Sequence, residues 1–184
     1  WLGAPRSDGA HVVEAVLPAQ RAQCLQVRFE VFVREQDVPL VLEVDARDFR
    51  PDVRHLLALD STGRALGTLR LIPDGGSHFH LGRLAVRARA RGRGIGALLV
   101  RSAHDLLAPT PAAGPGPRAG GRPRGGANEV DEGGEAPLVV LDAQVQAEGF
   151  YRALGYAPTT GEVFLDAGIE HVTMSRRLGA RARH

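Results

Sequence analysis

Lysine is absent from this chain of 184 residues, so all 23 of its basic residues are arginines. Cysteine is scarce as well, because Cys24 is the only one. A single cysteine excludes an internal disulfide and is typical of a reducing compartment, so we expect a cytoplasmic protein. No apolar run approaches the roughly 18 residues that a membrane-spanning helix requires, so no membrane partner is expected.

The composition otherwise fits one globular domain. Hydrophobic residues make up 43% of the chain and charged residues 24%, which is enough apolar material for a sizeable core. The net charge is only +2, and the arginines are spread along the whole sequence. We therefore expect no nucleic-acid partner. Arg118 to Arg124 is the one short Arg/Gly-rich segment that keeps such a function as an alternative.

The central feature is a strand followed by a glycine-rich turn and a helix. Leu81–Val86 is a mostly apolar run that predicts a strand. Arg91–Gly96 reads RGRGIG, and from Ile95 onward apolar residues recur at helical spacing up to about residue 107. Glycines allow close approach of backbone N–H groups, and a helix N-terminus attracts negative charge. This stretch therefore predicts an anion-binding loop.

Three kinds of glycine loop compete for this segment. A Walker loop requires Gly-Lys-Ser/Thr, which a chain without lysine cannot supply. A dinucleotide-binding fingerprint requires a third glycine where Leu99 stands. The third kind fits: Arg91-x-x-Gly94-x-Gly96 directly after a Leu-Ala-Val strand resembles the coenzyme A pyrophosphate loop of the GNAT acetyltransferases.

The remaining elements are predicted from periodicity and turn residues. Leu25, Phe29, Phe32 and Val33 form a stripe at helical spacing that we expect to face the core. The segment from 109 to 136 is rich in Gly and Pro and is expected to be a disordered insertion in a single domain over residues 10–178, with flexible tails at 1–9 and 179–184. Strands are expected at 11–17, 53–59, 65–72, 77–87, 137–141, 163–165 and 172–174, and helices at 19–36, 95–107 and 143–154, the last of these capped by Asp142.

A second stretch makes the family resemblance more specific. LDAQVQAEGFYRALGY, ending at Tyr156, is similar to the GNAT signature that closes the cofactor site, with Gln144 where asparagine is usual. The resemblance implies an α+β fold, the GNAT acyl-CoA N-acyltransferase fold. Its central, mostly antiparallel twisted sheet is flanked by helices, and its fourth and fifth strands splay apart.

The resemblance also implies a cofactor site and a catalytic acid. Acetyl-CoA would be the co-substrate, and no metal is implied. Tyr151 stands where the family often has the acid that protonates the departing thiolate. The residues expected to contact acetyl-CoA come from the strand, the loop and the second signature: Leu84, Ala85, Val86, Arg91, Gly92, Arg93, Gly94, Ile95, Gly96, Ala97 and Gln144.

The acceptor side is predicted less sharply. Many GNATs carry a carboxylate just before the Leu-Ala-Val run, where this chain has Gly82 and Arg83, so His80, Glu35 and His171 are alternative bases. If Arg83 faces the cleft, the acceptor would carry a carboxylate or phosphate. The candidates for substrate contact are Arg28, Glu35, Arg83 and His171, and the resemblance adds Glu43 and Asp45.

The sequence thus favours an N-acetyltransferase that moves an acetyl group from acetyl-CoA to a primary amine by direct attack. A small-molecule acceptor leads, with an amino sugar phosphate as one form. A protein or peptide acceptor and a non-catalytic acyl-CoA-binding member of the family are the alternatives. The sequence does not determine the oligomeric state, and a homodimer is one of the options.

Overall fold

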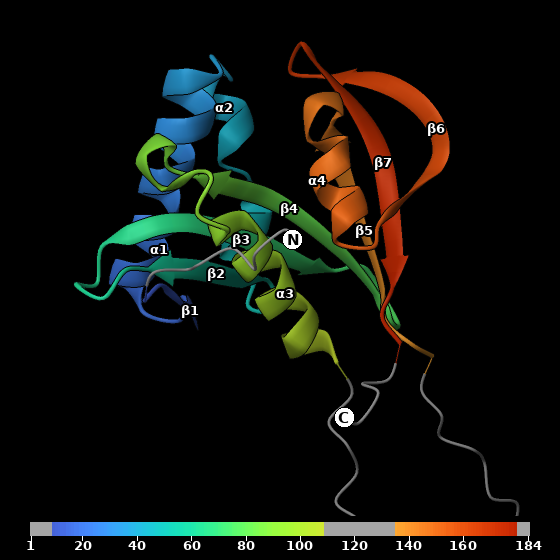
Figure 1. Cartoon of the computed structure of the whole chain (residues 1–184). Coiled ribbons are helices and arrows are strands. Elements are labelled where there is room, and N and C mark those ends of the chain that lie inside the picture. Colours follow the sequence, from blue (N-terminus) through green and yellow to red (C-terminus); the bar gives the residue numbers. More distant parts are fainter. Residues whose placement is uncertain (1–8, 109–134, 180–184) are drawn as a thin grey trace, which may run out of the picture.

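The computed structural model describes residues 9–108 and 135–179. Most of the expected insertion at 109–136 and nearly all of both expected tails lie outside these residues. Seven strands form one sheet in the order β1-β2-β3-β4-β5-β7-β6 (Figure 1). The strands are β1 His11–Glu14, β2 Arg54–Leu59, β3 Ala65–Pro73, β4 His78–Val86, β5 Leu138–Gln144, β6 Ala157–Asp166 and β7 Ile169–Arg177.

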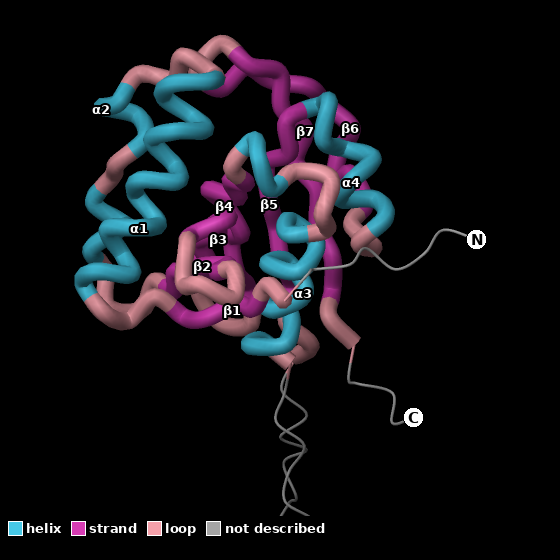
Figure 2. Tube along the Cα trace, turned by 60° about the vertical axis from the view of Figure 1, so that its left-hand side comes forward, coloured by secondary structure: helices cyan, strands magenta, loops and turns pink. Residues whose placement is uncertain are grey.

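Helices cover both faces of the β1–β4 part of the sheet. Helix α1 (Pro18–Arg28) packs on one face and α3 (Ile95–Leu107) on the other, as Figure 2 shows. Successive side chains of a strand point to opposite faces, so Leu56 joins the core beneath α3 while Leu57 joins the core beneath α1. Both leucines are almost fully buried. This half of the sheet therefore has a core on each of its faces.

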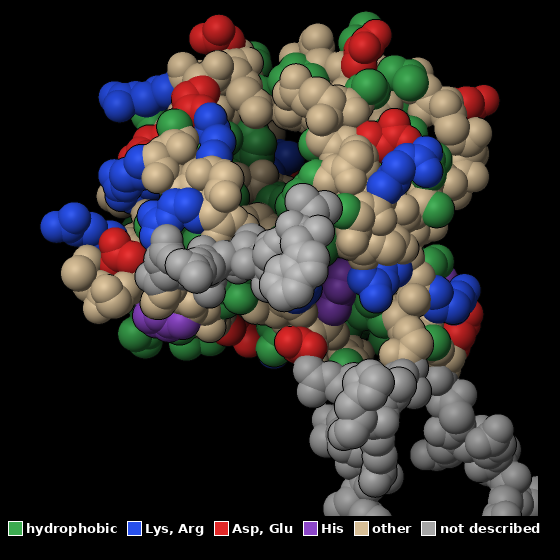
Figure 3. Space-filling view, in the orientation of Figure 1, with side chains coloured by type: hydrophobic (Ala, Val, Ile, Leu, Met, Phe, Trp, Pro, Cys, Tyr) green, Lys and Arg blue, Asp and Glu red, His purple; other side chains and the backbone are tan. Residues whose placement is uncertain are grey.

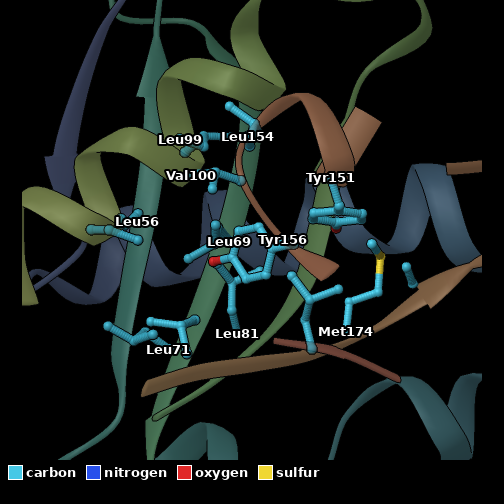
Figure 4. Close-up of a cluster of buried hydrophobic side chains, with 14 of the residues drawn as sticks. Leu56, Leu69, Leu71, Leu81, Leu99, Val100, Tyr151, Leu154, Tyr156 and Met174 are labelled. Atoms are coloured by element: carbon cyan, nitrogen blue, oxygen red, sulfur yellow. The ribbon is translucent and has the colours of Figure 1, made fainter. Parts of the chain in front are cut away.

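The larger core joins α3 to the second half of the sheet. Leu69 and Leu81 from the middle strands meet Leu99 of α3 and Met174 of β7 in one cluster (Figure 4). Tyr151, from helix α4 (Glu148–Ala153), and Tyr156 close the cluster from the other side. The core thus fixes the glycine loop and the second signature relative to one another.

Strands β4 and β5 pair only at one end. Their parallel ladder holds three positions: His78 with Leu138, Phe79 with Val139, and His80 with Val140. Beyond His80 the two strands diverge, so Leu81–Val86 faces β5 across an opening (Figure 1). Because β5 pairs along its full length with β7, the opening is confined to the β4 side. The expected fold with parted fourth and fifth strands is confirmed.

The first helix differs from its prediction. The helix expected at 19–36 is present, but α1 ends at Arg28, and a π-helix over Phe29–Glu35 follows and stops before Gln36. The buried side chains are Cys24, Val27, Arg28 and Val31, whereas Phe29 is exposed. The stripe that starts at Leu25 is therefore not the core face. The apolar residues lie all round this helix, so the spacing alone did not select the buried side.

Two further boundaries are corrected. The segment after Pro39, where no helix or strand was predicted, holds a short helix α2 (Leu40–Glu43) and a 3-10 turn, η2 (Ala46–Phe49). Asp142 does not cap a helix, because β5 continues to Gln144. A 3-10 turn, η4 (Val145–Ala147), then leads into α4. A further 3-10 turn, η3 (Ala88–Ala90), precedes the glycine loop. Among the described residues, no helix is long and apolar enough to span a membrane.

Candidate active site

A β-bulge in β4 shapes the first part of the site. Thr68 of β3 pairs with Ala85 while Arg70 pairs with Gly82, so two residues of β4, Arg83 and Leu84, face the single Leu69. Arg83 takes a positive φ of 53°, which is uncommon for a residue other than glycine. Such a bulge re-aims side chains and is over-represented beside active sites. Strict alternation therefore fails here, and Gly82, Arg83 and Leu84 all line one cavity.

This bulge cavity has a volume of about 570 Å³. Its walls come from the bulge, the segment after Pro39, and the strands on the far side of the opening. A smaller annex of about 170 Å³ shares Phe32, Arg83 and His171 with it. The polar and charged lining residues are Gln36, Asp45, Arg47, Arg70, His80, Arg83, Asp142, Gln144, Tyr151, Asp166 and His171. A cavity with this lining suits a polar, charged small molecule.

The glycine loop builds the second part of the site. Gly92 and Gly94 have φ values of 73° and 78°, in the left-handed region that glycine adopts without strain. Gly94 is the residue at which α3 begins, so the first backbone N–H groups of the helix face outward from the loop. A loop cavity of about 780 Å³ lies against this helix end and against Leu84, Ala85 and Val86 of β4. It offers an anion site beside an apolar slot.

The two cavities meet where the strands part. Gln36, Leu84, Ala147 and Phe150 line both of them. In the view of Figure 3 the molecule is hollowed between the lobe that carries α2 and the lobe that carries α4 and β6. A ligand in the loop cavity and another in the bulge cavity would therefore touch at Leu84. That arrangement suits transfer of a group from one ligand to the other.

Comparisons with known proteins agree with this geometry. The sequence model of the family described as "Acetyltransferase (GNAT) domain" matches residues 51–158. The chain belongs to the GNAT acetyltransferase family. The match spans the bulge, the glycine loop and the second signature, and GNAT enzymes use acyl-CoA, so the chain is an acyl-CoA-dependent N-acetyltransferase.

Individual relatives point the same way. The chain is 31% identical to a UPF0039 protein of Mycobacterium tuberculosis over 157 residues, which covers 84% of this chain and 82% of that protein. It is 28% identical to "Uncharacterized N-acetyltransferase YjcF" of Bacillus subtilis over 158 residues, covering 85% and 92% of the two chains. The crystal structure of an acyl-CoA N-acyltransferase from Pseudomonas aeruginosa is similar, with a TM-score of 0.64, 29% identity, and 91% and 97% coverage.

The loop cavity gathers most of the residues predicted to contact acetyl-CoA. It is lined by all of them except Arg93 and Gln144. Gln144 lies in the bulge cavity instead, where its side-chain amide donates a hydrogen bond of 2.9 Å to Gln36 Oε1. This bond joins β5 to the end of the π-helix across the opening. Gln144 is thus placed to hold the junction together rather than to hold the phosphates.

The Arg91 side chain adds less positive charge to the loop than the sequence suggested. Arg91 forms an ion pair with Glu35 and donates to the Val86 carbonyl at 2.9 Å, so its charge is already compensated. Glu35 therefore lines the loop cavity and lies away from the predicted acceptor side. Gly96 serves packing, since a Cβ there would lie 3.2 Å from Phe150 Cζ. The backbone N–H groups of the loop are therefore its candidate anion-binding groups.

Tyr151 is buried and lines the bulge cavity. Its ring packs edge-on against Phe150 at 4.9 Å and against Tyr156 at 5.8 Å between ring centroids. Burial raises the pKa of the Tyr151 hydroxyl well above its usual range. The hydroxyl is therefore protonated at neutral pH, which is the state that a hydrogen-bond or proton donor needs.

Arg28 is not placed for substrate contact. It is 1% exposed and lies beneath the segment after Pro39, where it pairs with Glu43 at 2.5 Å and Asp48 at 2.6 Å. Arg70 continues the network by pairing with Asp45 at 3.0 Å and Asp48 at 2.8 Å. We call this set the arginine cluster: Arg28, Arg70, Arg83, Glu43, Asp45 and Asp48. Burial alone would raise the pKa of Asp48, but Arg28 and Arg70 hold it far below its usual range.

The other two acceptor-side predictions fall in the cavity. Arg83 lines it, yet it donates to the Leu42 carbonyl at 2.9 Å and lies 3.3 Å from Glu43 Oε2, so the cluster compensates its charge. Burial lowers the pKa of Arg83, and Glu43 opposes that shift. His171 lines both the cavity and the annex, with Nδ1 2.8 Å from the Ile169 carbonyl. Asp142 and Asp166 join it there.

Three of these cavity residues escaped the sequence analysis for separate reasons. Gln36 was only the predicted end of a helix, Asp142 was assigned to a helix cap, and Asp166 lay beyond the predicted strand. The pairing of β5, β6 and β7 brings Asp142 and Asp166 to one wall, while Gln36 lies at the end of the π-helix and is bonded to Gln144. Among the described residues no group of three or more His, Cys, Asp or Glu side chains is arranged to hold a metal ion.

Proposed function

We propose that this protein transfers the acetyl group of acetyl-CoA to the primary amine of a small molecule by direct attack. Acetyl-CoA would occupy the loop cavity and the amine the bulge cavity. The observation that carries the proposal is the shared lining of the two cavities by Gln36, Leu84, Ala147 and Phe150, at the point where β4 and β5 part. Direct attack needs both substrates to meet in one place.

The residues around the loop cavity fit acetyl-CoA. The backbone N–H groups from Gly92 to Ala97 would bind the pyrophosphate, because Gly92 and Gly94 leave that backbone bare. Leu84, Ala85 and Val86 lie on the edge of β4 that β5 leaves unpaired, so this edge can accept the extended pantetheine arm. A backbone N–H of the same edge would polarise the thioester carbonyl as an oxyanion hole does.

Tyr151 is proposed as the catalytic acid. It lines the bulge cavity beside Phe150, one of the residues that both cavities share. As the carbon–sulfur bond breaks, the departing thiolate needs a proton or a strong hydrogen bond. The Tyr151 hydroxyl is protonated at neutral pH and can donate to the thiolate, although burial, which raises its pKa, makes it a weaker acid than a free phenol.

The acceptor is proposed to contact His171 and Arg83. An amino sugar phosphate is the finer form of this proposal, and Arg47 supports it, because its guanidinium lines the cavity and has no hydrogen bond or ion pair among the described residues. A peptide acceptor is the second candidate. The exposed Leu40, Val41 and Leu42 beside the cavity support it as a rim against which a chain could lie. A homodimer remains part of the proposal, with the exposed edge strand β6 as its contact.

The test is release of free thiol from acetyl-CoA in the presence of single amines. The panel contains glucosamine 6-phosphate, kanamycin, spermidine, benzylamine and a peptide with a free amino terminus. We expect turnover with at least one small amine and a rise in melting temperature with acetyl-CoA alone. Turnover with the peptide alone would select the second candidate. A thermal shift without any turnover would instead indicate a non-catalytic acyl-CoA-binding protein. The absence of both turnover and a thermal shift would refute the proposal.

A further inference from the structure

The two walls of the bulge cavity differ in how their charges are compensated. On the wall made by α2, η2, β3 and the bulge, three carboxylates and three arginines of the arginine cluster pair with one another. On the wall made by β5, β6 and β7, Asp142 and Asp166 have no arginine partner within the described part of the chain. The second wall is therefore the one that attracts an ammonium group.

His171 stands on that wall with one nitrogen already committed. The Ile169 carbonyl can only accept a hydrogen bond, so the Nδ1 atom 2.8 Å away carries the proton. In the neutral ring Nε2 then holds a lone pair, and it makes no hydrogen bond among the described residues. The ring also stacks on Phe164, with centroids 5.9 Å apart and planes 27° apart. The imidazole is thus held in one orientation with a free proton acceptor.

The register of the strands places His171 beside the junction of the two cavities. Its partner on β5 is Gln144, which is bonded to Gln36, one of the shared lining residues. His80 is the other histidine of the cavity, and it sits at the last paired position of β4 and β5. Leu84 lies four positions further along β4 than His80, a separation on the order of 10 Å. His80 therefore lies at the closed end, and burial lowers its pKa although Asp142 opposes that shift.

From this geometry we infer that His171 is the general base of the reaction, in a pocket where Asp142 and Asp166 hold the acceptor as its ammonium form. The inference rests on the proposed acetyl transfer. The charged and titratable groups that share the cavity or its annex with His171 are Asp142, Asp166, Arg83, Tyr151, Glu43, Asp45, Arg47, Arg70 and His80.

The step balances in protons and bonds. Nε2 takes one proton from the ammonium group, and the freed lone pair forms the carbon–nitrogen bond at the thioester carbonyl. The carbon–sulfur bond breaks, and the sulfur leaves with the Tyr151 proton. A second proton from the nitrogen restores the Tyr151 hydroxyl, the third stays on the amide, and His171 returns its proton to solvent. Without a base, an alkylamine of pKa about 10 would react from a very small neutral fraction at pH 7.

The test compares two amines that differ in their need for a base. An alkylamine such as benzylamine is charged at pH 7, whereas aniline is already neutral. His171→Asn keeps a donor toward the Ile169 carbonyl but removes the basic nitrogen. We expect it to lower kcat about 10²- to 10⁴-fold with the best alkylamine and less than about 10-fold with aniline. The acetyl-CoA thermal shift should stay as in the unmodified protein, and His78→Gln, outside the described cavities, is the control.

A readout without turnover accompanies the kinetics. Nitrogen NMR of the full chain labelled at histidine should show neutral His171 with its proton on Nδ1. Finding the proton on Nε2 would overturn the inference, as would equal losses with both amines or no loss at all. Loss of alkylamine turnover in His80→Gln alone would move the role to His80. If His171→Asn does not fold, His171→Gln takes its place with the same criteria. Absence of any turnover in the unmodified protein would count against the proposed function instead.

Discussion

The two halves of the sheet are built for different tasks. Strands β1–β4 are covered on both faces by α1 and α3. Buried ion pairs of the arginine cluster connect α1 and β3 to α2 and η2 at the bulge cavity. Strands β5–β7 carry α4 on one side only, and the long strand β6 is exposed along most of its length. The first half holds most of the backbone groups proposed to bind acetyl-CoA, and the second holds the side chains proposed for proton transfer.

This difference has a physical reason. A phosphate cradle must keep several N–H groups at fixed positions, so it belongs on the half with two cores. Side chains that exchange protons with a substrate must line the cavity that holds it, and Tyr151 and His171 do so from the half that carries α4. Four predictions follow this division, beginning with the change expected to cost most.

Breaking the arginine cluster should cost the most stability. Arg28→Ala leaves Glu43 and Asp48 buried, at 2% and 6% exposure, without their main partner. Removing one member of a buried pair costs about 3–5 kcal/mol, because the remaining charge is uncompensated. Urea unfolding measures this loss. Arg50→Ala, which removes an exposed pair with Asp52, is the control and should not change the midpoint measurably. A small loss for Arg28→Ala would mean that the covered half does not depend on its ion pairs.

The glycine loop connects the covered half to the proposed acetyl-CoA site. Gly94→Val places a β-branched residue at a φ of 78° at the start of α3. We expect the thermal shift by acetyl-CoA to disappear, because the loop must change shape and its N–H groups no longer converge. Gly161→Val, at a φ of 79° on β6, carries the same backbone strain away from the loop cavity. It should keep the shift, and loss of the shift in both variants would contradict the role of the loop.

The third prediction concerns Tyr151, on the half of the sheet that carries α4. Tyr151→Phe should lower kcat about 10²-fold with little change in the affinity for acetyl-CoA, since the hydroxyl acts late and the ring still packs on Phe150. Steady-state kinetics and a titration with acetyl-CoA separate the two effects. Tyr156→Phe is the matched control, because that hydroxyl bonds to His104 outside the described cavities. An unchanged kcat in Tyr151→Phe would leave Tyr151 as a packing residue only.

How much the sequence could predict follows the same division. The glycine loop and the helix that begins at Ile95 were found from local spacing, since the chemistry of both lies in consecutive residues. The opening between β4 and β5 was inferred from the family resemblance, and the short ladder from His78 to His80 confirms it. These features belong mainly to the covered half and to the junction.

The arginine cluster and the acidic wall could not be predicted in this way. Arg28 was predicted to contact the substrate, because nothing in its local sequence shows that Glu43 and Asp48 fold over it. Asp142 joins Asp166 and His171 on one wall only because β5 pairs with β7, which comes after α4 and β6 in the chain. Partners far apart in the chain, and a bulge that breaks alternation at Arg83, are set by tertiary pairing rather than by local pattern.

The smallest expected effect concerns the contact that joins the halves. His104 of α3 lies 2.8 Å from the Tyr156 hydroxyl, and burial lowers its pKa to about 4. The unfolded chain therefore binds a proton below about pH 6.5 that the folded protein refuses, so stability falls as the pH drops from about 6.5 toward 4. His104→Gln should reduce this fall by about 1 kcal/mol between pH 7 and pH 5, a figure discounted for partial solvent contact. His55, whose pKa burial also lowers to about 4, keeps part of the slope in both proteins. Urea unfolding at the two pH values measures the difference, and an unchanged slope in His104→Gln would show that burial does not lower the pKa of His104 in the folded protein.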